Sequence, residues 1–395
     1  MSKSVGEYQV RFSDPKLDGF QEPPQYCLVE LSPDIVDIVK QGQPSLTIRG
    51  KPDDDAVLCT RDKTYALRSV TLSNNFLIIS AASGSTIDSK AEENALVISG
   101  EATEILELVP TVPRLENLLG HLKGCEYYDD ESDEETYESN VNDPLRRRRV
   151  TLEDLRSTVQ ASDTELEAGL RKAKVLNLGG TLRPLPASNL SDFLVTTLLT
   201  IASRGLPRPP NPIPLHELTT HLEDDFQIPS DVMVQVASWY GVVSSKGSKQ
   251  MWEPDIKAIV ADIGVGLLRK EDGSHEEQQF LERWRGEVGD LFSAHVDVAL
   301  LEGNCLFTPI PTSRAAIDGI SSNTLSYYPR SALPPDPAQR FQSLFLTRAK
   351  WRVEEIQTYL EDIAVDKKER DRLMLKYTRQ ITEPDGVWAT ARVRY

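Results

Sequence analysis

The chain has 395 residues, a formal net charge of −17, 39% hydrophobic residues and 27% charged residues. This composition is ordinary for a soluble globular protein of roughly two to four domains, and the negative charge argues against a protein that coats nucleic acid through bulk charge. The sequence has no apolar run near the roughly 18 residues that cross a bilayer and no apolar leader at its start. Its four cysteines form no CxxC pair, so neither a zinc knuckle nor a disulfide framework is indicated.

Residues 1–125 are predicted to form a β-rich domain. Short apolar runs bounded by Gly, Asp, Asn or Pro occur at 26–31, 45–49, 56–60, 64–72, 76–80 and 95–100. Tyr65, Leu67 and Val70 alternate with polar residues, and a slip near Ser69 suggests a bulge. Strands at this spacing indicate a small barrel or sandwich. So few strands would leave open edges, which pairing with another chain would remove.

A short helix is expected at 112–123, followed by an acidic linker at 126–149. Glu126 to Asp143 contains nine acidic residues and no basic one, a composition that cannot bury enough apolar area to fold alone. The linker ends in a run of four arginines. This run is either a basic import signal or nucleic-acid contact, or a solvated charge cluster at the start of the next domain: Arg146, Arg147, Arg148 and Arg149.

From Val150 onward the pattern predicts a tandem winged-helix array. Thr151 and Asp154 form a capping box, a second capped helix begins at Asp163, and a hairpin is expected around Gly179-Gly180. Helix, turn, helix and hairpin is the local order of a winged helix, and it recurs about every sixty residues, with unit starts near 151, 214, 277 and 340. The predicted domains are winged helix 1 at 150–212, a middle winged-helix region at 213–335, and a C-terminal winged helix at 336–395.

The sequence carries no recognisable catalytic, cofactor-binding or metal-binding motif. It has no phosphate-binding P-loop, no dinucleotide fingerprint and no G-x-S-x-G elbow. His216 and His221 are five positions apart, so their imidazoles would diverge around a helix and could not readily share a zinc ion. The paired carboxylates Glu354 and Glu355 fall in the first turn of a predicted helix, where caps are common. We therefore predict a binding protein without a cofactor and not an enzyme.

The most informative positive feature is the final module. Residues 340–395 hold twelve Lys/Arg against nine Asp/Glu. A helix from Val365 to Gln380 would bury Leu373, Leu375 and Tyr377 and present cations on its remaining surface. Three interpretations stay open: DNA contact without strong sequence preference, protein contact, and a solvated face with i,i+4 pairs. The candidate contact residues are Arg348, Lys350, Arg352, Lys367, Lys368, Arg370, Arg372, Lys376 and Arg379.

Several stretches, in order along the chain, resemble the defective-in-sister-chromatid-cohesion family. This family comprises accessory subunits of the alternative replication factor C clamp loader that acts in cohesion. The stretches are 26–31, 56–74, 151–162, 327–341, 344–356, 375–379 and 389–392. The resemblance implies an α+β multidomain protein, with an N-terminal β-barrel-like domain completed by partner chains and a C-terminal winged-helix array. The family is usually described with three winged helices, whereas the spacing above suggests as many as four units, of which one, 213–270, is alternatively helical packing inside a neighbouring module.

The resemblance also implies partners and a location. The N-terminal domain would form a heterotrimer with the C-terminal tail of the large clamp-loader subunit and a small accessory subunit. The winged helices would dock on the catalytic part of DNA polymerase epsilon and bind single- and double-stranded DNA in the nucleus. Five residues in the family stretches are expected to be structural: Tyr65, Ser73, Asn74, Phe341 and Trp351. Two other classes stay open on the residues alone, a stand-alone winged-helix transcription regulator and a protein-only scaffold.

Overall fold

A computed structural model describes residues 9–12, 26–42, 46–51, 54–81, 95–115, 118–127, 149–247, 249–270, 273–309 and 323–392. The chain divides into two compact units. The N-terminal unit comprises residues 1–113 together with 160–165, and the C-terminal unit comprises 114–159 together with 166–395. Among the described helices, none is long and apolar enough to cross a membrane. Three arginines of the predicted basic run, Arg146, Arg147 and Arg148, lie outside the described residues.

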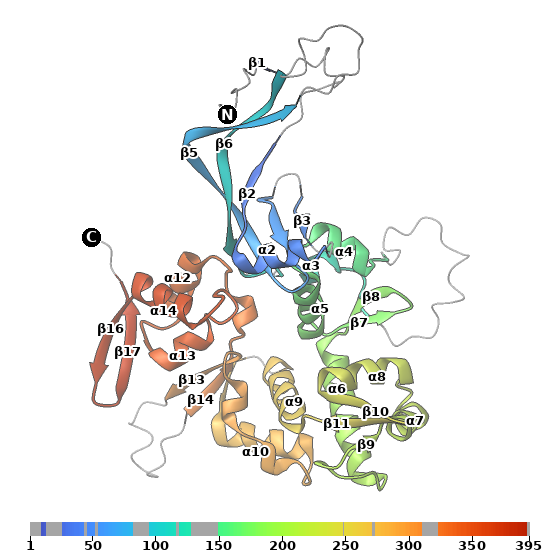
Figure 1. The fold of residues 1–395 in the computed structure, drawn as a ribbon. Coiled ribbons are helices and arrows are strands. Elements are labelled where there is room, and N and C mark those ends of the chain that lie inside the picture. Colours follow the sequence, from blue (N-terminus) through green and yellow to red (C-terminus); the bar gives the residue numbers. More distant parts are fainter. Residues whose placement is uncertain are drawn as a thin grey trace, which may run out of the picture. The chain divides into compact units, whose positions relative to one another are not determined.

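The N-terminal unit is built on an open six-stranded sheet of mixed direction (Figure 1). Its strands follow the order β1-β6-β5-β4-β3, and β2 also pairs with β6. The long strands β5 and β6 run antiparallel, whereas β1 and β2 both run parallel to β6. The elements are β1 (Gln9–Phe12), β2 (Leu28–Glu30), α2 (Pro33–Lys40), β3 (Thr47–Arg49), β4 (Val57–Cys59), β5 (Thr64–Ala81) and β6 (Ala95–Pro110).

The described strands do not close into a barrel, and two local predictions were wrong. The runs predicted at 64–72 and 76–80 belong to one strand, β5. The register of β5 against β6 shifts between Thr71 and Phe76 and again after Ile78, not near Ser69. Among the described residues, Ile35 of α2 packs on Leu58 and Tyr65 of the sheet, and Val57 and Cys59 of β4 are also buried.

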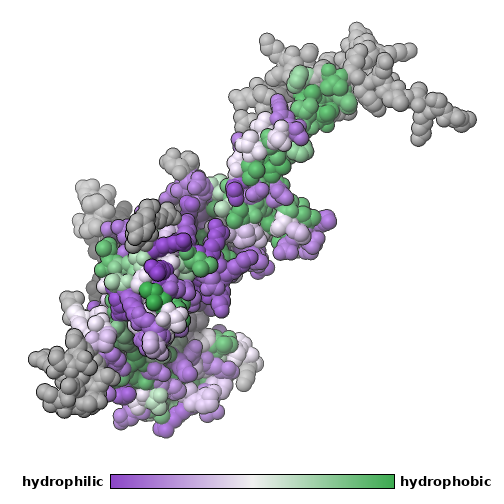
Figure 2. All heavy atoms as spheres, turned by 90° about the vertical axis from the view of Figure 1, so that its left-hand side faces the viewer, coloured by the Kyte–Doolittle hydropathy of each residue, from purple (hydrophilic) through white to green (hydrophobic). Residues whose placement is uncertain are grey.

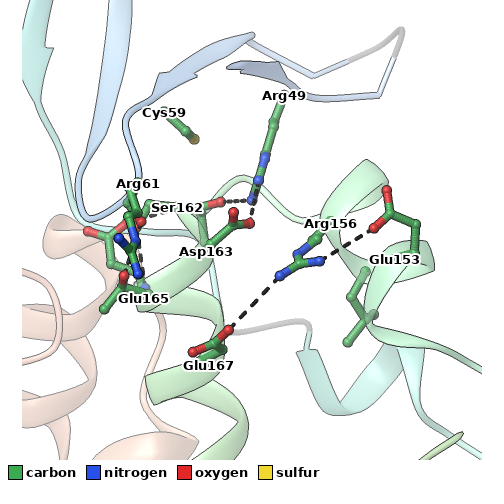
Figure 3. A network of polar contacts seen from close by, with 12 residues as sticks. Arg49, Cys59, Arg61, Glu153, Arg156, Ser162, Asp163, Glu165 and Glu167 are labelled. Carbon is green, nitrogen blue, oxygen red and sulfur yellow. Dashed lines mark hydrogen bonds and ion pairs between the residues drawn. The ribbon is translucent and has the colours of Figure 1, made fainter. Parts of the chain in front are cut away.

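A turn from much later in the chain completes the N-terminal unit (Figure 3). Ala161 and Ser162 are fully buried. The Arg49 guanidinium donates to the Ala161 carbonyl and lies 2.6 Å from Asp163 Oδ1. The Ser162 amide donates to Thr64 Oγ1 at 2.9 Å. The sheet therefore depends on residues 160–165, which lie outside the domain predicted at 1–125.

The C-terminal unit repeats one element order, which we number as modules 1 to 4. Modules 2 and 4 each run helix, short strand, two helices and a hairpin, and module 3 has the same order with two 3-10 helices in place of the second helix. In each of the three sheets the last strand lies between the other two. Module 1 has two helices and a hairpin, with a single bridge from Thr151 to Thr181. Module 1 contains α4 (Leu152–Thr158), α5 (Asp163–Lys172), β7 (Val175–Leu178) and β8 (Thr181–Pro184).

The remaining modules have the following elements. Module 2 contains α6 (Ala187–Ser203), β9 (Ile213–Pro214), α7 (Leu215–Phe226), α8 (Ser230–Trp239), β10 (Gly241–Lys246) and β11 (Lys249–Pro254). Module 3 contains α9 (Ile256–Lys270), β12 (Ser274–Glu276), α10 (Glu277–Val288), η3 (Ser293–His295), η4 (Val298–Leu301), β13 (Cys305–Pro309) and β14 (Asn323–Tyr327). After η5 (Arg330–Ala332), module 4 contains α12 (Pro337–Thr347), β15 (Lys350–Arg352), α13 (Val353–Thr358), α14 (Lys367–Tyr377), β16 (Thr378–Glu383) and β17 (Gly386–Ala391).

Local signals placed several of these elements correctly. The predicted capping box of α4 is confirmed, because Thr151 accepts from the Asp154 amide while the Asp154 side chain accepts from the Thr151 amide. Gly179 and Gly180 both have positive φ, as the β7–β8 turn requires. The helix expected at 112–123 is seen only as the four-residue α3 (Leu118–His121).

Shared packing ties the modules together. One apolar cluster runs through modules 2 and 3 and includes Trp252 and Trp284. Modules 3 and 4 are joined by polar contacts, since Tyr359 Oη donates to the Cys305 carbonyl at 3.0 Å. The acidic segment begins and ends on the C-terminal unit. The Tyr127 amide donates to the Pro184 carbonyl at 2.9 Å, and the Leu182 amide donates to the Val150 carbonyl at 2.9 Å.

Candidate nucleic-acid interface and partner surface

The four modules differ in how far the helix that precedes the hairpin is exposed to solvent. In module 2, α8 faces module 1, where Gln235 bonds to the backbone of Asn177 through both its amide oxygen (2.8 Å) and its amide nitrogen (3.1 Å). In module 3, this position holds only the 3-10 helices η3 and η4. In module 1, the first turn of α5 contacts the N-terminal sheet. Among the described elements, α14 of module 4 is a full helix with an exposed outer face.

Local chemistry fixes both ends of α14. The Asp366 side chain accepts from the Glu369 amide at 2.7 Å, and Glu369 accepts from the Val365 amide at 2.8 Å. Thr378 Oγ1 donates to the Met374 carbonyl at 2.7 Å. The acidic residues lie at the positive end of the helix dipole, which stabilises the start of the helix.

The apolar face of α14 differs from the prediction. Met374 is its buried residue, and Leu373 and Tyr377 are half-buried. Leu375, predicted to be buried, is 68% exposed. Since successive residues are about 100° apart around a helix, Leu375 lies about 200° from Leu373 and cannot share the face on which Leu373 and Met374 meet the core.

The exposed face of α14 is strongly basic. Lys368, Arg372 and Lys376 follow one another at four-residue spacing, so they form a row with about 6 Å of axial rise between neighbours. Arg370 differs, because it lies 3.9 Å from Glu361. Five exposed cations on α14 and at the start of β16 make no ion pair with another described residue. They are Lys367, Lys368, Arg372, Lys376 and Arg379.

The three predicted cations before α13 have acidic partners within module 4. Arg348 binds both Glu355 oxygens at 2.9 Å and donates to the Phe307 carbonyl of module 3 at 2.7 Å. Lys350 lies 2.5 Å from Glu383 Oε1, and Arg352 lies 3.4 Å from Asp385 Oδ2. The candidate site therefore separates into a paired set (Arg348, Lys350, Arg352, Arg370) and an unpaired set (Lys367, Lys368, Arg372, Lys376, Arg379).

Two carboxyl groups beside the paired cations have shifted pKa values. Burial raises the pKa of Glu355, and Arg348 opposes that shift. A hydrogen bond from the Trp388 indole lowers the pKa of Asp385, with a smaller effect of Arg352 in the same direction. Trp388 also lies under both cations, with Lys350 Nζ 4.3 Å and Arg352 Cζ 5.1 Å from its ring centroid. These contacts hold Lys350 and Arg352 on the sheet of module 4.

Arg340 positions the segment before α14, and the sequence analysis did not identify it. It is only 2% exposed. It donates to the carbonyls of Pro334 at 2.7 Å and Tyr359 at 2.8 Å, and it pairs with Asp362 through both terminal nitrogens. The one local signal was an arginine on the apolar face of α12, next to Phe341. Phe341 and Trp351 are buried, as predicted for structural residues.

The N-terminal unit exposes an apolar surface of a different kind. Phe12, Ile98 and Ile79 are aligned across three adjacent strands, with Phe12 73% and Ile79 48% exposed. Val10 lies on the same edge strand and is 57% exposed. Figure 2 shows hydrophobic side chains along the β5–β6 ribbon. An exposed apolar patch of this kind is typical of a surface that meets another chain.

The described part of the chain offers no other recognisable chemical site. None of its His, Cys, Asp and Glu residues form a group that could hold a metal ion. Of the predicted basic run, Arg149 is described and exposed.

The described helices and sheets define the class as a mixed α+β protein built from several small modules. The family model for "Sister chromatid cohesion protein Dcc1" matches residues 26–360. The chain therefore belongs to this family, and membership implies a role in sister chromatid cohesion.

Similar proteins from distant eukaryotes cover most of this chain. Sister chromatid cohesion protein DCC1 of Mus musculus is 29% identical over 366 residues, covering 90% of this chain and 84% of its own length. The DCC1 protein of Homo sapiens is 28% identical, covering 89% of this chain and 85% of its own length. The DCC1 protein of Saccharomyces cerevisiae is 23% identical, covering 90% of this chain and 94% of its own length. The family is named for cohesion and not for a catalytic activity.

Proposed function

We propose that the chain is a non-catalytic, nuclear accessory subunit of the alternative replication factor C clamp loader. The N-terminal unit joins the large-subunit tail and a small accessory subunit. Modules 1 to 4 act as a winged-helix array that docks on DNA polymerase epsilon and binds single- and double-stranded DNA. In this role the chain supports clamp loading and unloading during replication and cohesion.

The unpaired cations of α14 are the observation that carries the DNA-binding part. Phosphate contacts supply most of the affinity in sequence-independent binding, and they need cations that are not already neutralised. The row of Lys368, Arg372 and Lys376 meets this need on a chain whose net charge is −17. Because this row lies on one helix face, it suits contact with successive phosphates of one strand.

The exposed apolar patch around Val10 and Phe12 supports the partner-binding part. The described strands of the N-terminal sheet leave its edges open, and pairing with strands from other chains would cover these edges and the apolar patch. This also favours an obligate subunit over a stand-alone transcription regulator, which would need no partner at this sheet.

Leu375 favours polymerase docking by the same module. It is 68% exposed at the centre of the basic face, and an exposed apolar residue among cations suits a partially acidic protein surface better than phosphate alone. The Leu375→Asp variant should weaken binding of the polymerase catalytic part more than tenfold in a pull-down. Unchanged polymerase binding would place that contact elsewhere.

The direct test uses the full chain co-purified with the two presumed clamp-loader subunits. We expect the complex to bind fluorescent DNA of unrelated sequences with similar affinity, and we expect salt to weaken that binding. An absence of DNA binding at low salt would favour the hypothesis of a protein-only scaffold over that of a DNA-binding subunit. A strong preference for one sequence would instead support the transcription regulator.

A further inference from the structure

The described strands of the N-terminal sheet leave two edges open, and these two edges are not equivalent. One edge is β3. The other lies along β6, where β1 pairs with residues 95–98 and β2 pairs with residues 105–107. Between these two short strands, residues 99–104 of β6 have no described strand beside them on that side.

The β3 edge offers little to a partner. Its length does not set it apart, because β3 and β2 have three residues each; the difference lies in the side chains. The side chain of its last residue, Arg49, is 9% exposed and is bound to Ala161 and Asp163 of the same chain. Ile48 is 69% exposed, but its neighbours across the sheet, Leu58 and Tyr65, are already buried in the core.

The β1/β2 edge carries the exposed apolar stripe. Val10 and Phe12 of β1 stand beside Leu96 and Ile98 of β6. In the gap between β1 and β2, Tyr26 covers Gly100, where an added Cβ would come within 2.3 Å of the Tyr26 ring. Aromatic and β-branched side chains on an edge strand suit pairing with another extended chain.

The β2 end of the same edge is acidic. Strands β2 and β6 together contain four glutamates and no lysine or arginine. Glu30 and Glu107 are direct neighbours in the parallel register, and neither makes an ion pair with a described residue. They line a groove of about 360 Å³ together with the apolar side chains of Leu31, Pro33, Leu108 and Val109. Two adjacent carboxylates repel each other unless a cation lies between them.

We propose that the β1/β2 edge, and not β3, accepts the partner strand of the complex. The occupant is an extended segment of another chain. It places apolar side chains against the stripe at Val10 and a lysine or arginine against Glu30 and Glu107. This inference rests on the proposed function, because it assigns the edge at which the clamp-loader partners join.

A matched pair of variants tests the assignment in the full chain co-expressed with the two presumed partner subunits. Val10→Asp and Ile48→Asp each place a charge at an exposed β-branched position on opposite edges of one sheet. We expect Val10→Asp to lower the co-purified partner more than tenfold and Ile48→Asp to leave it unchanged. Thermal unfolding of each variant alone should match the parent chain, because both side chains are already exposed.

Charge reversal gives a second measurement. The Glu30→Lys/Glu107→Lys variant should lose partner most at low salt, whereas Asp34→Lys/Asp37→Lys, the same change of charge on the exposed face of α2, should not. The edge assignment would be overturned if Ile48→Asp lost the co-purified partner, alone or together with Val10→Asp, or if both variants retained it. None of these results would contradict assembly of the complex itself. Failure of the parent chain to capture either subunit would instead reject the proposed function.

Discussion

Removing the unpaired row of α14 should change how DNA binding depends on salt. In the Lys368→Ala/Arg372→Ala/Lys376→Ala variant, three cations that make no ion pair with a described residue are lost. Each phosphate contact contributes about 0.9 to the slope of log affinity against log salt on duplex DNA and about 0.7 on single strands. If each of the three residues meets one phosphate, the slope should become shallower by about 2.7 on duplex and about 2.1 on single strands.

The measurement is fluorescence anisotropy with labelled duplex and single-stranded DNA across a salt series, using the co-purified complex. The helix should persist, because alanine has the highest helix propensity and the three side chains are exposed. The control is Lys350→Ala/Arg352→Ala, which removes cations already paired with Glu383 and Asp385 and should change the slope by less than about 1. An unchanged slope in the triple variant, or a larger change in the control, would refute the assignment of phosphate contacts to α14.

Three further predictions concern stability and reactivity. Arg340→Leu removes a buried guanidinium that holds three carbonyls and Asp362, so it should cost about 3 kcal/mol or more in urea unfolding; a loss below about 1 kcal/mol would contradict this role. Gly241→Ala should destabilise by about 2 kcal/mol, because φ is +151° and the added Cβ would lie 2.2 Å from the Glu253 carbonyl oxygen. Its control, Gly286→Ala in α10, meets no atom within 4 Å and should be neutral or stabilising. Iodoacetamide should label exposed Cys27 and spare Cys305 at pH 8, because burial raises the pKa of the Cys305 thiol to about 12. Since that pKa is above the ordinary value of 9.0, the neutral Cys305 thiol contributes its full stabilisation of the folded chain below pH 9, and this contribution is lost as the pH rises from 9 to 12. Rapid labelling of Cys305 at pH 8 would contradict the raised pKa.

Short-range signals in the sequence predicted much of the C-terminal unit. These signals determine structure only a few residues away in the sequence. They include the capping pair Thr151 and Asp154, the glycine pair at 179–180 and the charged helix near 367–377. The opening helices α6 and α9 were missed as module starts, because an apolar helix shared between modules lacks a clean one-sided pattern, whereas α12 lies at the unit start predicted near 340.

Contacts between distant residues could not be predicted in the same way. Arg49 and Asp163 are 114 positions apart, and nothing local in either segment indicates the other. Arg348 is a second example. Its charge led to the prediction of a nucleic-acid contact, but in the structure it binds Glu355 and the Phe307 carbonyl. Pattern and propensity report local preference, whereas the ionic state of a surface depends on which segments the fold brings together.

Tyr127 and Val150, the described residues that flank the acidic segment, are both tied to β8, at Pro184 and Leu182. Both ends of the segment are thus held on one strand. The entropy of closing a flexible loop between two fixed ends grows only with the logarithm of its length, so doubling the length of a loop costs about 0.6 kcal/mol. A reporter peptide or small tag spliced into this segment should therefore leave the melting temperature of the protein almost unchanged, which makes it a practical place to attach a probe to the assembled complex.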